Sequence, residues 1–327
     1  MQQAIALIQS SKSILLTGHL RADGDCLGAQ IVLFYALQAL GKEVQIMLPN
    51  APDQRYGFLE QKTSWQVFDG TLPDYDLLIA CDCNELARLG DMVPLILERD
   101  QPKMVVDHHI MMTPEVWDGA FHDVAAAASG VLAIELAKQL GVEDLPAAAY
   151  EAAFVALMTD TGWLKYSNAD SRAWEMASYL IAKGVDASKI YDSVYQKLEA
   201  GRPLGVAAAL QNLQYHADGR LAIAWVTNDL LAECGGSLED TDEILDLLRA
   251  VEQVEAVALL CERDAGQIKI SLRSKSLLDV NKVARRLGGG GHARAAGASF
   301  DVGVGMPAAV KQTLEVLSDE LAQQESN

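Results

Sequence analysis

Cysteine is scarce in this chain of 327 residues, which has five of them at scattered positions. An odd and irregularly spaced set in a chain of this length argues against a disulfide framework and fits a reducing compartment. Cys81 and Cys83 form a C-x-C pair, but the sequence has no second pair to complete a zinc site. We therefore expect both to be small apolar residues that flank Asp82.

Positive charge is also in short supply, with 26 lysines and arginines against 45 acidic residues and a formal net charge of −19. Affinity for long nucleic acid comes mainly from cations that neutralise phosphates, so we expect no such partner. A short anionic substrate held by bound cations remains compatible with this charge.

Long apolar runs are missing too. No stretch reaches the ~18 residues that indicate a membrane span. The N-terminus lacks the basic region and the apolar core of a signal peptide. We therefore expect a cytoplasmic protein with no membrane partner.

What the chain does have, over its first ~190 residues, is an alternation of short apolar runs with helical patterns that predicts an α/β fold with a parallel sheet. The predicted strands are Ser13–Thr17, Glu43–Leu48, Leu77–Cys81, Lys103–Asp107 and Ala120–His122. The predicted helices are Gly28–Leu40, Ala127–Leu140, Ala147–Met158 and Ser171–Lys183, with glycines that end three of them at Gly41, Gly141 and Gly184.

The pattern changes after Gly184, where we predict a helical connector over residues 186–210 between a first domain, 1–185, and a smaller α/β domain with a mixed sheet, 211–327. In the connector, Ser188–Leu198 is expected to be a helix that Gly201-Arg202-Pro203 breaks. The elements predicted beyond it are strands with hairpin-like spacing at Leu221–Val226, Val254–Cys261 and Gln267–Leu272, a helix Thr241–Val251 opened by a capping box of Asp240 and Glu243, and a closing helix Met306–Gln323.

Four apolar segments end in side chains that can bind a metal. Asp107-His108-His109 follows one strand, Asp82 follows another, and Asp160 follows a predicted helix. His19, Asp23 and Asp25 come after the first strand. A parallel sheet brings the ends of its strands to one edge, where open α/β folds bind their ligands.

Histidine with several carboxylates and no thiolate suits Mn²⁺ or Mg²⁺, with Fe²⁺, Co²⁺ and Zn²⁺ as alternatives. These side chains are enough for two ions, which in two-metal sites lie ~3.5–4 Å apart and clamp a phosphoryl group. Without ions, the four aspartates outside the Asp107 segment would repel one another and raise each other's pKa.

Taken singly, each position has a simpler explanation, because an aspartate after a strand is usually a cap and a lone histidine is usually structural. The combination is much more specific. His122 and His216 lie outside these segments, and we interpret both as structural.

The second half carries a glycine-rich segment, Gly288 to Gly291, followed by His292, Ala293 and Arg294. Consecutive glycines let backbone N–H groups approach a phosphate, and a helical stretch expected after them would add a positive dipole end. The alternative is a flexible turn. We favour phosphate binding because the guanidinium of Arg273, at the end of a strand, suits bidentate contact. The predicted substrate-binding residues are Arg273, Gly289, Gly290, Gly291, His292 and Arg294.

The segments Gly18–Gly28, Asp82–Asn84, Val106–His109 and Thr159–Gly162 resemble, in order, the four motifs of the DHH phosphoesterase superfamily. Val280–Ala284 and the glycine-rich segment resemble the DHH-associated domain. The superfamily includes RecJ-type exonucleases, nanoRNases and family II pyrophosphatases. The two-domain length is similar to nanoRNases that also remove the 3′-phosphate of phosphoadenosine phosphate.

The resemblance implies roles for individual residues. His19, Asp23 and Asp82 would hold one ion, and Asp82 would bridge to a second ion. The ligands of the second ion would be Asp25, Asp82, His108 and Asp160. His109 would face the substrate phosphate, and Asp107 would orient the histidines. The chain departs from the family pattern at Ala22, Ala29 and Leu164, none of which is a ligand, so these differences bear on substrate preference.

The resemblance thus implies a DHH catalytic domain that binds two divalent cations, with Mn²⁺ as first choice and Mg²⁺ or Co²⁺ as alternatives, and a DHH-associated substrate-binding domain. The predicted activity is hydrolysis of very short oligoribonucleotides and linear dinucleotides to mononucleotides, and of 3′-phosphoadenosine 5′-phosphate. A phosphodiesterase for cyclic dinucleotides and a catalytically silent nucleotide sensor are the alternatives. The sequence leaves open whether the chain forms a homodimer.

Overall fold

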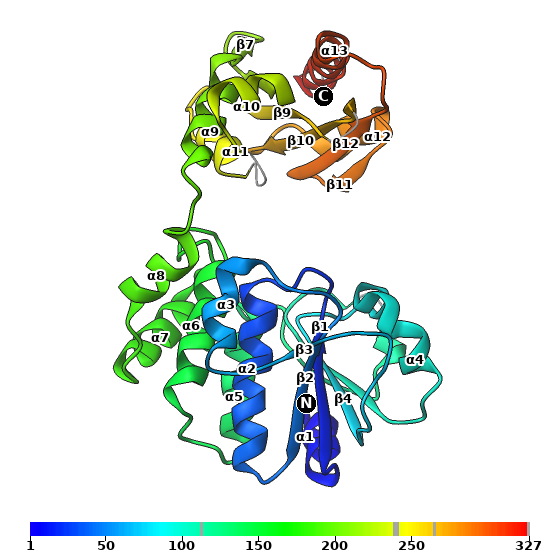
Figure 1. The fold of residues 1–327 in the computed structure, drawn as a ribbon, viewed down its shortest axis with the longest axis vertical. Helices are drawn as coiled ribbons and strands as arrows, with labels where there is room; N and C mark the ends of the chain where they lie inside the picture. Colours follow the sequence, from blue (N-terminus) through cyan, green and yellow to red (C-terminus); the bar gives the residue numbers. More distant parts are fainter. Residues whose placement is uncertain (112–113, 238–241, 264–265, 326–327) are drawn as a thin grey trace. The chain divides into compact units, whose positions relative to one another are not determined.

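The computed structural model describes residues 1–111, 114–237, 242–263 and 266–325. The chain forms two compact units, Met1–Lys197 and Leu198–Asn327, which are shown in Figure 1. Helix α8 (Ala187–Tyr195) belongs to the first unit and α9 (Gly201–Gln211) to the second. The boundaries that the sequence predicts for the first domain, at residue 185, and for the connector, at residue 210, stay a prediction.

The first unit contains a six-stranded sheet in the order β3-β2-β1-β4-β5-β6, and all its strand pairs are parallel. The predicted parallel sheet is thus confirmed, and the five predicted strands match observed ones to within one residue. Only the two-residue edge strand β3 was not expected. The strands are β1 (Ser13–Gly18), β2 (Glu43–Leu48), β3 (Gln66–Val67), β4 (Leu77–Cys81), β5 (Lys103–Asp107) and β6 (Gly119–His122).

Helices cover both faces of this sheet, which is why β4 is buried along its whole length. One face packs on the larger core cluster with α2, α5 and α6, and the other packs on η2 and α4 (Figure 1). The helices of the unit are α1 (Gln2–Ser10), α2 (Gly24–Ala39), η1 (Gln54–Tyr56), α3 (Gly57–Glu60), η2 (Leu86–Met92), α4 (Val93–Leu97), η3 (Pro114–Val116), α5 (Ser129–Gln139), α6 (Ala147–Asp160), α7 (Ser171–Ala182) and α8.

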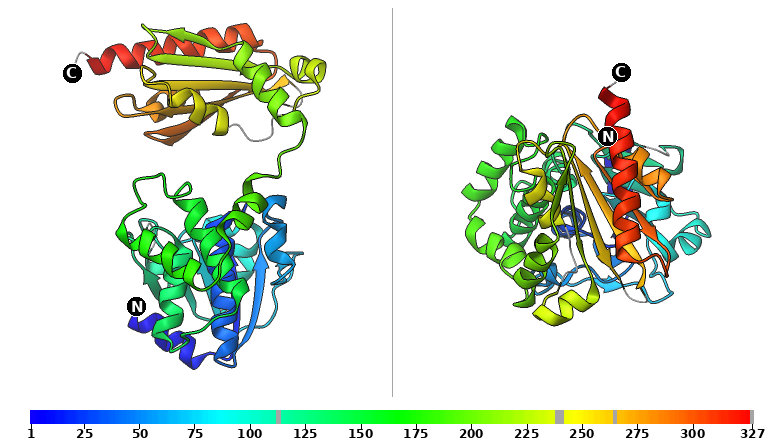
Figure 2. Two further views of the ribbon diagram at one scale, coloured as in Figure 1. Left: turned by 90° about the vertical axis from the view of Figure 1, so that its left-hand side faces the viewer. Right: turned by 90° about the horizontal axis from the view of Figure 1, so that it is seen from above.

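The second unit contains a mixed sheet, as predicted, and its strands lie in the order β11-β12-β10-β9-β8-β7. Figure 2 shows the sheet from two further sides. Helices α12 and α13 cover one face, and α9, α10 and α11 cover the other beside β8 and β9. The strands are β7 (Gln214–His216), β8 (Leu221–Val226), β9 (Ala256–Glu262), β10 (Ile268–Ser274), β11 (Gly290–His292) and β12 (Ala295–Phe300). The helices are α9, α10 (Asn228–Cys234), α11 (Asp242–Arg249), α12 (Val280–Arg286) and α13 (Met306–Glu325).

Several sequence predictions are wrong in detail. Gly201-Arg202-Pro203 begins α9 instead of breaking a helix, because a proline in the first helical turn loses no hydrogen bond. Strands β8 and β9 pair in parallel, so they form no hairpin. Helix α2 starts at Gly24, four residues before the predicted start. Asp240 of the expected capping box lies outside the described residues.

The helix expected after the glycine-rich segment is also absent, since β11 and β12 follow there. The helix next to the glycines is α12, which precedes them and ends at Arg286. Within the described ranges, no helix is both long and apolar enough to cross a membrane.

Candidate metal centre

The strand ends that carry the motif residues meet in the middle of the first sheet. The register pairs Cys81 with Gly18 on one side and with Val106 on the other. The residues that follow, including His19 and Asp82, therefore lie beside each other at the carboxyl edge. This edge lies where the strand order reverses, which is the usual ligand position in open α/β sheets.

Helix α2 begins with two acids of the cluster. Asp23 is its N-cap, and its Oδ1 accepts hydrogen bonds from the N–H groups of Asp25 and Cys26, both at 3.1 Å. Asp25 is buried and accepts from the N–H groups of Ser129 at 2.7 Å and Gly130 at 2.8 Å, at the start of α5. The positive ends of two helices thus stabilise this pair of carboxylates.

Burial raises the pKa of Asp25 well above its ordinary value, and the nearby carboxylates of Asp82 and Asp160 add to the rise. Burial also raises the pKa of Asp160, to about 6. The Asp160 carboxylate accepts a hydrogen bond from Asn168 Nδ2 at 3.2 Å. Ionising these two carboxylates therefore costs free energy in the folded protein, and a bound cation would offset that cost.

Asp82 lies at the centre of the cluster, and its φ of 56° is in the left-handed region, which few non-glycine residues adopt. Its Oδ2 is 3.4 Å from His19 Nε2, and its Oδ1 is 3.6 Å from His108 Nε2. Ser129 Oγ donates to Oδ1 at 2.9 Å. Burial would raise the pKa of Asp82, but the hydrogen bond with His19 and the charges of His109 and His108 lower it.

Backbone carbonyls fix the orientation of two imidazoles. His19 Nδ1 donates to the Leu20 carbonyl at 2.8 Å, and His108 Nδ1 donates to the Ala126 carbonyl at 3.0 Å. A carbonyl only accepts, so in the neutral imidazole the other nitrogen, Nε2, carries the lone pair and points into the cluster.

The Nε2 atom of His108 is buried, and it has no hydrogen-bond partner among the described residues. It lies 3.6 Å from Asp25 Oδ2 and 3.8 Å from Asp160 Oδ2. A lone pair that faces carboxylate oxygens at such distances is repelled unless a cation or a proton lies between them. The donor set therefore fits a metal ion, since neutral imidazole and carboxylate are both metal ligands.

His109 has a different setting. Asp107 is fully buried, and its Oδ1 accepts from both the backbone N–H of His109, at 2.7 Å, and Nδ1, at 2.9 Å. This hydrogen bond raises the pKa of His109 to about 9. Asp107 thus orients His109, whereas His108 is held by the Ala126 carbonyl instead. His122, interpreted as structural, donates from Nε2 to the His109 carbonyl at 2.6 Å.

All six residues predicted as metal ligands converge in the described structure. Three groups have ligand atoms within 4.8 Å of one another: His19, Asp23 and Asp82; Asp25, His108 and Asp160; and Asp82, His108 and His109. Two contacting residues, Ser129 and Asn168, were missed from the sequence. No sequence pattern marks either one, because their partners Asp82 and Asp160 are identified only by the fold.

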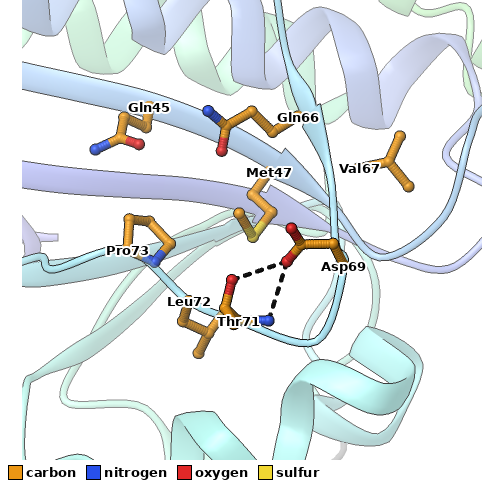
Figure 3. Close-up of a pocket in the computed structure, with 8 residues that line it drawn as sticks. All are labelled: Gln45, Met47, Gln66, Val67, Asp69, Thr71, Leu72 and Pro73. Carbon is orange, nitrogen blue, oxygen red and sulfur yellow. Dashed lines mark hydrogen bonds between the residues drawn. The ribbon is translucent and has the colours of Figure 1, made fainter.

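The surface carries a larger groove away from this cluster, about 590 Å³ in volume, which Figure 3 shows at the edge of the sheet beside β2 and β3. None of the predicted site residues lines it. Its acid, Asp69, accepts hydrogen bonds from the side chain and the N–H of Thr71, which lower the pKa of Asp69.

A smaller cavity of about 200 Å³ is lined in part by Asp23 and Asp160, so it adjoins the cluster.

In the second unit, the register brings two predicted binding residues onto one face. Arg273 of β10 and His292 of β11 both pair with Ala295 of β12. Residues opposite one another point to the same side of a sheet, and two strand spacings separate these two by roughly 10 Å. The residue of β12 between them in the register is Ala295, whose side chain is small.

The glycines of this segment have structural roles. The N–H groups of Gly288 and Gly289 donate to the carbonyls of Arg285 and Ala284, so they cap α12. A Cβ on Gly289 would lie 2.1 Å from the Gly297 carbonyl oxygen. The expectation of a positive helix end at these glycines is wrong, since the carbonyl end of α12 faces them.

The other residues of the segment differ in what the fold demands of them. Gly291 has a φ of 144°, and a Cβ there would lie 2.6 Å from the Ala295 carbonyl oxygen, whereas Gly290 has open space. Arg294 donates to the Leu278 carbonyl at 3.0 Å. Gly291 is therefore needed for the backbone of the β11–β12 hairpin itself.

Comparison with known proteins covers nearly the whole chain. Residues 13–158 match the DHH family, N-terminal domain, and residues 220–323 match the DHHA1 domain. The bifunctional oligoribonuclease and PAP phosphatase NrnA of Thermus thermophilus is 29% identical over 94% of this chain and 90% of its own length. The protein of the same name from Bacillus subtilis is 26% identical over 91% of this chain and 92% of its own. The crystal structure of an exopolyphosphatase-related protein from Bacteroides fragilis has a TM-score of 0.89 at 23% identity, covering 99% of this chain and 98% of that one.

Proposed function

Because this chain belongs to the DHH family and carries a DHHA1 domain, we propose that it is a metal-dependent phosphodiesterase that hydrolyses very short oligoribonucleotides and linear dinucleotides to mononucleotides. The names of its relatives, oligoribonuclease and PAP phosphatase, support this substrate class. They also support 3′-phosphoadenosine 5′-phosphate as a second substrate. RNA fragments as substrates fit the cytoplasmic location expected from the sequence.

The observation that carries the proposal is the convergence of imidazole and carboxylate ligands around Asp82. His19, Asp23 and Asp82 would hold one divalent cation. The second would be held by Asp25, Asp82, His108 and Asp160. Four carboxylates offset the charge of two such ions, and a set without thiolates favours Mn²⁺, with Mg²⁺ or Co²⁺ as alternatives. When bound, the two ions would offset phosphate charge and acidify a water molecule.

The protein's own groups supply the rest of the chemistry. His109, which Asp107 orients, would donate a hydrogen bond to a phosphate oxygen and stabilise the charge that develops there. One such donor contributes about 10²–10³-fold in kcat. Ser129 holds Asp82, and Asn168 holds Asp160, so both keep ligands in position.

The second unit would bind a phosphate or a terminal nucleotide of the substrate. Arg273 and His292 share the face of the sheet that holds Ala295, and they offer a guanidinium and an imidazole as donors. Gly289, Gly290, Gly291 and Arg294 complete the predicted segment. The net charge of −19 favours short substrates, because long nucleic acid would be repelled.

A substrate panel with Mn²⁺ tests the proposal. It compares a linear ribodinucleotide, a pentanucleotide, a long RNA fragment, 3′-phosphoadenosine 5′-phosphate, a cyclic dinucleotide and pyrophosphate. We expect the highest kcat/KM for the dinucleotide, loss of activity with a chelator, and recovery when Mn²⁺ is restored. Faster cleavage of the long RNA would contradict the proposal. A preference for the cyclic dinucleotide would support that alternative, and nucleotide binding without turnover at any metal would indicate a silent sensor.

A further inference from the structure

A cavity of about 200 Å³ adjoins the metal cluster within the first unit. Pockets that enclose a whole drug-sized ligand have volumes of about 300–1,000 Å³, so this one is sized for a single ring system. Two of its lining residues are acids of the cluster, which places any occupant next to the reacting phosphate. It is lined by Asp23, Arg55, Tyr56, Thr159, Asp160, Val194 and Tyr195.

The aromatic wall of the cavity is half-exposed and held in place. The Tyr195 residue is 36% exposed and ends α8. Its ring centroid lies 5.7 Å from that of Trp163 at an interplanar angle of 87°, and 5.2 Å from that of Tyr191 at 32°. Tyr56, the other aromatic residue of the cavity, is buried in the core. The Tyr195 ring is therefore oriented before any ligand arrives, which lowers the entropy cost of binding.

An unusual turn connects this aromatic cluster to the metal site. Trp163 and Leu164, just after Asp160, have φ values of 63° and 61°, a region that few non-glycine residues adopt. Their N–H groups donate to the Met158 carbonyl at 2.7 Å and to Thr161 Oγ1 at 3.0 Å. The turn brings Trp163 against Tyr195, so the same short segment positions a metal-site acid and the aromatic wall. Strained backbone of this kind clusters at ligand-binding sites.

A cation lies at the rim. Arg55 belongs to η1, and its Nη2 is 3.1 Å from Asp53 Oδ2. Its side chain is partly exposed, so it can contact a phosphate or a ribose hydroxyl of a bound nucleotide. The cavity thus combines an aromatic face and a guanidinium with acids of the cluster.

We propose that this cavity is a nucleobase subsite of the first unit, where Tyr195 stacks on the base of a nucleotide attached to the scissile phosphate and Arg55 contacts its sugar-phosphate backbone. The inference rests on the proposed function and assigns the base next to the cleaved bond to the DHH unit. Stacking on an aromatic ring accepts every base, so the subsite adds affinity without sequence preference. It would explain how a small enzyme binds a substrate with only two bases.

The test compares a ribodinucleotide with two analogues that lack either the 5′ or the 3′ base. Tyr195→Ala should lower kcat/KM for the dinucleotide by about 5- to 150-fold, the range for losing one base–aromatic stack. It should leave one of the two analogues within about twofold of the wild-type value, which identifies the base that occupies the cavity. Tyr195→Phe, which keeps the ring, should retain wild-type kinetics. Trp174→Ala is the matched control, because Trp174 is 56% exposed on α7 and lies outside the cavity.

Equal losses on all three substrates would make Tyr195 a packing residue only, and no loss would show that the cavity is unused. Either result overturns the inference. Tyr195→Leu replaces the alanine variant if that variant fails to fold. If the wild-type protein cleaves none of the substrates, the proposed function fails, and calorimetry with Mn²⁺ decides the subsite. AMP should then bind more tightly than ribose 5-phosphate, with a smaller ratio in Tyr195→Ala, and an unchanged ratio would overturn the inference.

Discussion

The two units of this protein place their acidic side chains in opposite ways. The first unit gathers Asp25, Asp82 and Asp160 at one sheet edge, where burial and mutual repulsion raise the pKa of Asp25 and Asp160. The second unit buries Glu255 among the backbone N–H groups of residues 276–278, which hold it by hydrogen bonds. The clustered carboxylates of Asp25 and Asp160 repel their neighbours and would be stabilised by an added cation, while Glu255 is stabilised by hydrogen bonds of the fold itself. The first arrangement is typical of a binding site, and the second is typical of a structural contact.

The arrangement of strands also differs in its consequence. In the parallel sheet, residues that follow different strands meet at one edge, so ligands from distant segments converge. In the mixed sheet, it is the cross-strand register that brings Arg273 and His292 onto one open face. The first unit thus gathers its candidate metal ligands at strand ends, and the second aligns its two predicted binding residues across neighbouring strands.

The strongest test of this contrast is Asp82→Ala. Since Asp82 faces both His19 and His108, its removal should lower kcat/KM by at least ~10³-fold. The variant should stay folded without metal, because a repelling carboxylate is gone. Mn²⁺ should raise the melting temperature of the wild type but not that of the variant. Kinetics and thermal melts measure both effects. Asp69→Ala, at the groove in Figure 3, is the control, and near-wild-type activity of Asp82→Ala would refute the central role.

A smaller loss is expected for Ser129→Ala. Ser129 Oγ donates to Asp82 Oδ1, so the variant should weaken Mn²⁺ activation and lower activity by about 10–100-fold. A titration of activity against Mn²⁺ concentration measures the shift. Ser193→Ala removes an exposed helical hydroxyl and should change nothing. A Ser129→Ala variant with the wild-type Mn²⁺ dependence would show that the contact is incidental.

Arg273→Ala tests the second unit. Loss of charge-assisted hydrogen bonds should raise KM for a dinucleotide about tenfold. KM for a small generic phosphodiester, which lacks the terminal nucleotide that Arg273 is proposed to bind, should stay unchanged. Lys269→Ala is the control, since Lys269 lies on the same strand and the same side. An equal rise for both substrates would remove the recognition role of Arg273.

The smallest expected effect concerns Glu255. Burial would raise its pKa, but hydrogen bonds from the N–H groups of Leu278, Ser276 and Leu277 outweigh burial and lower it. A carboxyl group with a lower pKa in the folded state adds stability above its unfolded pKa, and this stability is lost as pH falls through the lowered pKa of the folded state. Glu255→Gln should lower the free energy of unfolding by about 2 kcal/mol at neutral pH. The stability of this variant should also no longer fall in acid through residue 255.

Hydrogen exchange of the amides at residues 276–278 gives the local measurement. In the wild type their protection should fall in acid, while in Glu255→Gln it should be low at all pH values. Glu262→Gln offers a comparison, because Glu262 accepts one hydrogen bond, from the Asn228 N–H. Acid-independent protection in the wild type would show that Glu255 contributes nothing through its charge.

Much of the fold of the first unit was predictable, because its central strands are continuous apolar runs and three of its long helices are followed by glycines. Some of the elements that escaped prediction are short, whereas others, such as α1, α9 and β12, are longer. Strands β3, β7 and β11 have two or three residues, too few for a periodic pattern. The glycine-rich segment misled the sequence analysis for a physical reason, since close approach to backbone calls for glycine in a hairpin as it does at a phosphate.

By itself, the sequence determined which chemistry this protein carries, because imidazoles and carboxylates at strand ends are local features of a residue's type and position. Only the tertiary structure decided which atoms meet. Ser129 contacts Asp25 and Asp82 across 104 and 47 residues of chain. Tyr195 lines the cavity beside Asp160 and packs on Trp163, which belongs to a turn with left-handed backbone. These contacts depend on strand register and helix packing, which are long-range properties that no short segment of sequence contains.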